Sequence, residues 1–130
     1  MKTKNILFLS TILFGLTSIT SCKKNDTGGK ASLHVMVYNG SSAINASTLY
    51  VKFDEHHQPT DPTNNYDLKI QGEAYDNHVH VEDLRMGEYY LYAIGYDSIT
   101  KKTVAGGVAT SINWSERKEM KSVDLVLHSH

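Results

Sequence analysis

The most informative stretch of the sequence is Leu84-Arg85-Met86-Gly87-Glu88-Tyr89-Tyr90-Leu91-Tyr92-Ala93. It starts in a predicted loop, passes through a glycine and continues as a predicted strand, Glu88–Tyr96. Gly87 lacks a Cβ and therefore adopts backbone conformations that other residues resist. Tyr89 enters the strand just after it, where its hydroxyl is able to bond back to the turn, as in a tyrosine corner. The stretch therefore predicts a loop, a sharp turn and a strand with Tyr89 buried at its start.

The strand predicted at Glu88–Tyr96 is apolar or aromatic on both of its faces, because successive side chains point to opposite sides. The inward face carries Tyr89, Leu91 and Ala93. The outward face carries Tyr90, Tyr92, Ile94 and Tyr96. An apolar outward face needs cover. Either a loop of the protein, for which Gln58–Asn65 is long enough, or a protein or glycan partner supplies it.

Tyrosine suits a contact surface because its ring stacks while its hydroxyl stays hydrated. We therefore predict a binding surface at Tyr90, Tyr92 and Tyr96. The competing interpretation is that β-strands favour tyrosine in any case and that the protein's own loops cover these rings.

The rest of the chain after residue 30 has the same two-residue periodicity, which is typical of strands. Predicted strands occupy 31–38, 47–54, 66–74, 78–84, 88–96, 102–110 and 121–128. Clusters of glycine, proline, asparagine and aspartate separate them. No stretch after Cys22 has a convincing helical stripe. Seven short strands in about 100 residues predict an all-β sandwich.

Residues 84–93 resemble the L-x-x-G-x-Y-x-L-x-A signature of transthyretin-like and carboxypeptidase-regulatory-like domains. The resemblance implies a seven-stranded Greek-key sandwich. The motif is also similar to that of fibronectin-like and immunoglobulin-like sandwiches. Met86 stands where the family usually has a proline.

The N-terminus has the order of features of a bacterial export signal. Lys2 and Lys4 make it positive, and an apolar run over residues 6–19 follows. That run is shorter than the roughly 20 apolar residues of a membrane-spanning helix and has the length of a signal-peptide core. It ends in Ile19-Thr20-Ser21-Cys22, which resembles a lipobox. We therefore predict a cleaved lipoprotein signal at residues 1–21 and a covalent lipid on Cys22, the only cysteine of the chain.

The mature chain is predicted to comprise a lipidated tether at residues 22–30 and one sandwich domain at 31–130. Lys23 follows the cysteine. Because Gram-negative lipoproteins with aspartate there tend to stay in the inner membrane, we expect this chain at the outer membrane, facing either the periplasm or the cell surface. The membrane is its first partner, through the lipid.

Charge and motifs favour a non-enzymatic role. The predicted signal holds two of the 13 basic residues and none of the 14 acidic ones, so the mature chain has a formal net charge of −3. It has no basic run, which disfavours a nucleic-acid partner. No sequence motif of a nucleophilic, metal-dependent or phosphate-binding enzyme occurs, and we expect no cofactor beyond the lipid. The leading hypothesis is a binding or structural module at the outer membrane.

Histidine and tryptophan supply the remaining candidates. Seven histidines all follow residue 33. His78 and His80 should share one strand face, which suits two imidazoles on one metal ion. The alternative hypothesis for the function is therefore a periplasmic metal-handling protein. The competing interpretation is that these histidines lie on the surface and have no function. Trp114 either plugs one end of the sandwich or lies at a ligand site, and Gly106-Gly107 predicts a bulge or a close backbone approach.

Overall fold

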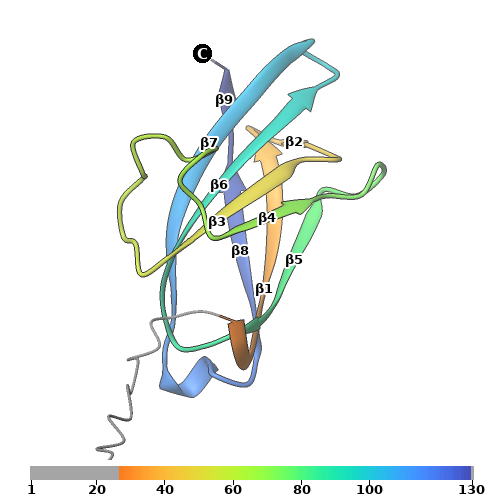
Figure 1. Cartoon of the computed structure of the whole chain (residues 1–130). Helices are drawn as coiled ribbons and strands as arrows, with labels where there is room; N and C mark the ends of the chain where they lie inside the picture. Colours follow the sequence, from red (N-terminus) through yellow and green to blue (C-terminus); the bar gives the residue numbers. More distant parts are fainter. Residues whose placement is uncertain (1–26, 130) are drawn as a thin grey trace, which may run out of the picture.

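The chain folds into two β-sheets in a computed structural model that describes residues 27–129 (Figure 1). The first sheet contains β1 (Thr27–Asn39), β2 (Ser42–Ala43), β5 (His78–Leu84) and β8 (Met120–Val126). The second has the order β4 (Leu68–Gln71), β3 (Thr48–Phe53), β6 (Gly87–Asp97), β7 (Lys102–Ile112) and β9 (His128–Ser129). The prediction of an all-β sandwich is confirmed.

All seven predicted strands coincide with strands of the structure, and their boundaries differ by a few residues. The fourth is shorter than predicted, since β4 contains four residues. Two further strands, β2 and β9, contain two residues each. Strands so short have too little alternation to be recognised from a pattern of period two.

The first sheet is organised around β1. This strand pairs antiparallel with β5 and parallel with β8, so the first and last long strands of the domain lie side by side. Val35, for example, is opposite Val79 on one side and Val123 on the other. In the second sheet, β6 has β3 and β7 as antiparallel neighbours.

The core lies between the sheets and follows directly from the alternation of side chains. Buried, mostly aliphatic residues from both sheets form it: Leu33, Val35, Val37, Leu49, Val51, Val79, Val81, Leu84, Tyr89, Leu91, Ala93, Val104, Ile112, Val123, Leu125 and Leu127, with Ala31 and Ile44. Each fully buried valine or leucine contributes about 1.5–3 kcal/mol. This core is the main source of stability.

The turn before β6 has the predicted corner. Gly87 has a φ of 142°, a region that side-chain-bearing residues rarely adopt. The Tyr89 hydroxyl donates a hydrogen bond to the Arg85 carbonyl oxygen at 2.5 Å, and the ring is fully buried. The sequence-based prediction for Tyr89 is confirmed.

The domain begins earlier than Ala31, where the first predicted strand starts. Thr27 already pairs with Leu84, and a register shift separates that pair from the next one, between Ala31 and Leu84. Gly29 lies so close to the Leu84 carbonyl that no Cβ would fit there. Residues 27–30, predicted as part of a tether, are therefore in β1, and the glycines that suggest flexibility are needed for this close contact.

Between β7 and β8 lies a short 3-10 helix, η1 (Trp114–Glu116). The Asn113 side chain accepts from the Glu116 backbone N–H, and the Glu116 carboxylate accepts from the Asn113 N–H, each at 3.1 Å. Trp114 is 66% exposed, so the interpretation that it plugs the end of the sandwich is wrong. Within residues 27–129 the structure has no helix with the length and apolar character needed to cross a membrane.

Candidate functional site

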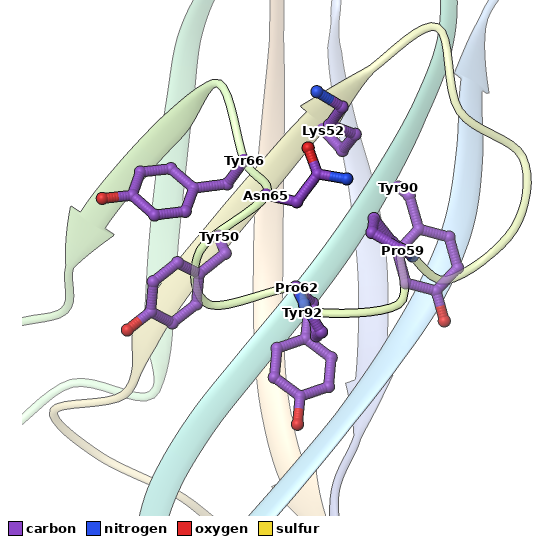
Figure 2. Close-up of a pocket in the computed structure, with 8 residues that line it drawn as sticks. All are labelled: Tyr50, Lys52, Pro59, Pro62, Asn65, Tyr66, Tyr90 and Tyr92. Carbon is purple, nitrogen blue, oxygen red and sulfur yellow. The ribbon is translucent and has the colours of Figure 1, made fainter.

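The outer face of the second sheet carries the predicted tyrosines, and the segment 54–67 crosses it (Figure 2). Pro59 of this segment is buried, and Tyr90 beneath it is 9% exposed. The Tyr90 hydroxyl donates to Gln58 Oε1 at 3.3 Å. Burial, with Tyr92 nearby, raises the pKa of Tyr90. The protein's own loop therefore covers Tyr90, which is one of the two covers considered from the sequence.

A glycine makes room for the Tyr90 ring. Tyr90 is opposite Ala109 in the register of β6 and β7, and Tyr92 is opposite Gly107. A Cβ placed on Gly107 would lie 2.5–2.8 Å from the ring and hydroxyl of Tyr90. A Cβ on Gly106, on the other side of the strand, would lie 2.6 Å from the Val126 carbonyl oxygen. The close backbone approach predicted for this pair is confirmed at Gly106, whereas Gly107 makes room for a side chain.

Three further tyrosine rings continue the aromatic face toward β4. Tyr50 and Tyr92 are cross-strand partners with ring centroids 6.5 Å apart, and Tyr66 meets Tyr50 edge-on at 5.1 Å. Pro62 lies beside Tyr92 (Figure 2). The rings and prolines leave no cavity among them that would hold even a water molecule, whereas pockets for drug-sized ligands measure roughly 300 Å³ or more. This cluster is a packed seam rather than a ligand cavity.

Polar contacts hold the covering segment at Asp67, its last residue, and in its middle. Asp67 Oδ2 accepts from the Phe53 backbone N–H at 2.7 Å and lies 3.6 Å from Lys52 Nζ. In the middle, the Asp61 carbonyl accepts from the Asn65 backbone N–H at 2.7 Å, and the Asp61 carboxylate accepts from Asn64 Nδ2 at 2.8 Å. The segment is thus tied to β3 and braced within itself.

The three predicted surface tyrosines are consequently not equivalent. Tyr90 is buried, Tyr92 is half-buried in the aromatic seam, and Tyr96 is 57% exposed near the end of β6. Ile99, in the following turn, is 75% exposed. Of the three predicted tyrosines only Tyr96 is exposed, and Ile99, which was not predicted, is exposed close to it in the sequence.

The outer face of the first sheet carries a histidine cluster, consisting of His34, His78 and His80. His34 on β1 is opposite His80 on β5. Its ring stacks on that of His80, with centroids 4.4 Å apart and planes at 28°. It meets His78 edge-on at 4.5 Å. The sequence indicated His78 and His80 as a pair, whereas His34 joins them only because of the β1–β5 register.

Burial and like charge act on His34. Its Nε2 is buried and has no hydrogen-bond partner among the described residues. Burial first, and then His80 and His78, lower the pKa of His34, and Asp76 opposes them. The cluster therefore favours a neutral His34.

A hollow of about 250 Å³ lies beside the cluster, lined in part by Glu73, Asp76, His78 and His80. Asp76 Oδ1 lies 3.0 Å from His78 Nδ1 and also accepts from the His78 backbone N–H at 2.8 Å. Among residues 27–129, no three histidine, cysteine, aspartate or glutamate side chains are arranged to hold a metal ion. The rings of His34 and His80 stack on each other, and their nitrogens do not converge on a common point.

The predicted lipidation site, Cys22, lies outside the described residues. Comparison of the chain with protein-family models, with curated proteins and with solved structures found no match in any of the three. The function proposed below therefore depends on the sequence and on the geometry of the domain.

Proposed function

We propose that this chain is a bacterial lipoprotein, anchored through a lipid on Cys22 to the outer membrane. Its sandwich acts there as a non-enzymatic binding or structural module, on the periplasmic or the cell-surface side. The observation that carries the proposal is the order of features at the N-terminus: positive residues, a short apolar run, small residues and the single cysteine.

The position of the domain relative to the cysteine supports an anchor. Cys22 precedes Thr27, the first residue of β1, by five residues. Even a fully extended chain of this length spans only about 18 Å. A lipid on Cys22 would therefore hold one particular end of the sandwich close to the membrane surface.

The domain is further proposed to have the seven-stranded Greek-key topology of the transthyretin-like family. The Tyr89–Arg85 hydrogen bond at the corner and the parallel pairing of β1 with β8 support this assignment. Domains with this topology often serve as spacers or recognition modules. That likeness of fold supports a module more than it supports any particular partner.

The partner surface is proposed at the end of the sandwich opposite Thr27. There the β6–β7 turn carries the exposed Ile99, and Tyr96 lies just before it (Figure 1). An anchored module meets soluble partners most easily at its membrane-distal end. Exposed tyrosine and isoleucine suit an apolar contact with a protein or with the face of a sugar ring.

Labelling with an alkyne fatty acid tests the anchor. We expect the wild-type chain to take up the label and to fractionate with outer membranes, and the Cys22→Ser variant to do neither. Equal labelling of both chains would contradict the proposal. For the module, partner capture from detergent-solubilised membranes should fall when Tyr96 and Ile99 are both changed to serine, without a change in melting temperature.

Metal handling through His78 and His80 is the second candidate function. The observation that favours it is the carboxylate of Asp76 at His78 Nδ1, since metal-binding imidazoles commonly have such a partner on their other nitrogen. It ranks second because the His34 and His80 rings stack rather than converge. A zinc titration, described in the Discussion, separates the two candidates.

A further inference from the structure

The end of the sandwich at which β1 begins has a hollow of about 320 Å³ rimmed by basic side chains. Three segments that are distant in the sequence meet there: the start of β1, the β5–β6 loop and the residues after η1 (Figure 1). They contribute Lys30, Arg85, Met86, Arg117 and Lys118. The sequence has no basic run, so this grouping of four cations arises only from the fold.

Trp114 extends the same surface. The Arg117 guanidinium lies 3.7 Å from the centre of the Trp114 ring, and Arg117 Nη1 donates to the Trp114 carbonyl oxygen at 2.7 Å. Trp114 is 66% exposed and Met86 is 40% exposed. We use the name basic end for Lys30, Arg85, Met86, Trp114, Arg117 and Lys118. It combines a solvent-facing indole, a thioether and four cations.

The charged residues among those that line the hollow are all basic, although the predicted mature chain is acidic overall. Glu116 is neutralised by Lys121, whose Nζ lies 3.2 Å from its carboxylate. None of the described residues that line the hollow is acidic, and the other nearest acids along the chain are Glu82, Asp83, Glu88 and Glu119. Positive charge around an exposed indole is complementary to phosphate groups above an apolar layer, because tryptophan favours the membrane–water interface.

We propose that the basic end lies on the anionic phospholipid surface of the membrane that holds the Cys22 lipid. The indole of Trp114 sits at the headgroup level, and Lys30, Arg117 and Lys118 lie near the lipid phosphates. This inference rests on the proposed function, because the anchor brings this end, and no other, to within about 18 Å of the lipid.

The consequence is a fixed orientation of the domain. Acyl chains on the cysteine would retain the protein at the membrane, but they do not by themselves fix the orientation of the domain. A second contact, made by basic residues and an indole, fixes that orientation. The sandwich then stands on its basic end, and the β6–β7 turn with Tyr96 and Ile99 points away from the bilayer.

The test uses Trp114 itself, because it is the only tryptophan of the chain. The mature lipidated protein is reconstituted into vesicles of phosphatidylcholine alone, or of phosphatidylcholine with phosphatidylglycerol in equal parts. A portion of the lipid carries a nitroxide on its headgroup, which quenches indole fluorescence on contact. We expect a blue-shifted emission and strong quenching with phosphatidylglycerol, both weakened by high salt. Unchanged emission in the two lipids would overturn the proposal.

Charge reversal with a matched control separates a specific surface from overall charge. Lys30→Glu with Lys118→Glu changes two exposed residues of the basic end and should abolish the quenching. Lys101→Glu with Lys102→Glu makes the same change in net charge at the β6–β7 turn and should leave it intact. Equal loss in both double variants would contradict a localised contact.

The same mature chain carrying Cys22→Ser distinguishes failure of this inference from failure of the anchor. Sedimented with vesicles, it should bind phosphatidylglycerol weakly. Reversing Lys30 and Lys118 should lower that binding by at least tenfold, since each lysine near an anionic surface is worth about fivefold. Salt-sensitive binding without lipidation in cells would refute the anchor and keep the surface. Lipidation in cells without any such binding would refute the surface and keep the anchor.

Discussion

The sequence predicted a candidate binding site on each of the two outer faces of the sandwich, but the structure shows that the two faces differ. Each has a strand with ring-bearing side chains on the side away from the core: tyrosines on β6 and histidines on β5. On the tyrosine face, the segment 54–67 crosses the sheet and buries Tyr90. On the histidine face, His80 is exposed and His78 is half-buried beside an open hollow.

The difference shows that an aromatic stripe on a strand does not by itself mark a binding surface. The tyrosine face has become a small second core, with prolines and a loop amide packed on its rings. The histidine face has gained a third ring, His34, and lacks a covering segment among the described residues. On the tyrosine face, burial of Tyr90 packs the loop onto the sheet. On the histidine face, burial lowers the pKa of His34.

The largest effect is expected from Tyr90→Ser. Removing a buried aromatic ring costs about 3 kcal/mol of unfolding free energy, through lost burial and the cavity left behind. Tyr96→Ser, on the same face of the same strand but 57% exposed, should cost less than about 0.5 kcal/mol. Urea unfolding of both variants measures the contrast. A small loss for Tyr90→Ser would mean that the loop does not seal this face.

Gly107→Ala should have the next largest effect. The added methyl group would lie 2.5–2.8 Å from the Tyr90 ring, so the ring must shift. Such overpacking costs about 1–3 kcal/mol.

A double-mutant cycle supplies the control for Gly107→Ala. In a Tyr90→Ser background the alanine has no ring to displace, and its cost should largely vanish. If the cost is the same in both backgrounds, the strain arises in the strand backbone and not in the contact with Tyr90.

On the histidine face we expect a smaller, pH-dependent effect. The pKa of His34 is lowered by burial and by its two histidine neighbours, so the unfolded chain binds a proton more readily than the folded one. Stability from this group is complete above its unfolded pKa, about 6.5, and is lost as the pH falls through the lower folded value. Melting temperatures should therefore fall by a few degrees on mild acidification.

His34→Gln should flatten this acid-dependent loss, whereas His128→Gln, an exposed histidine on β9, should leave it as in the wild type. Melting curves recorded between about pH 8 and about pH 5 compare the three chains. A wild-type slope in His34→Gln would mean that burial of this ring does not influence folding.

The smallest effect is expected from metal ions. Because His34 and His80 stack instead of converging, calorimetric titration with zinc or copper should detect no sub-micromolar site. His78→Ala with His80→Ala is the matched variant. A tight site that disappears in this variant would promote metal handling above the binding module.

Local chemistry was readable from the sequence wherever a residue's role depends on its immediate neighbours. The alternation of apolar residues predicted the long strands, because a strand between water and a core must bury every second side chain. Gly87 and Tyr89 predicted the corner, since both the unusual φ and the hydrogen-bond acceptor at Arg85 lie within four residues of the tyrosine. The N-terminal signal is likewise a local pattern, and lipidation of Cys22 stays a prediction.

Only the tertiary structure decided which of these features meet. The fate of Tyr90 depends on a segment more than 20 residues away, and His34 reaches His80 through a strand register that alternation leaves open. The basic end is assembled from three segments, none of which is a basic run. The physical reason is the same in each case: period two specifies which way a side chain points, whereas its neighbours depend on how distant strands and loops pack together.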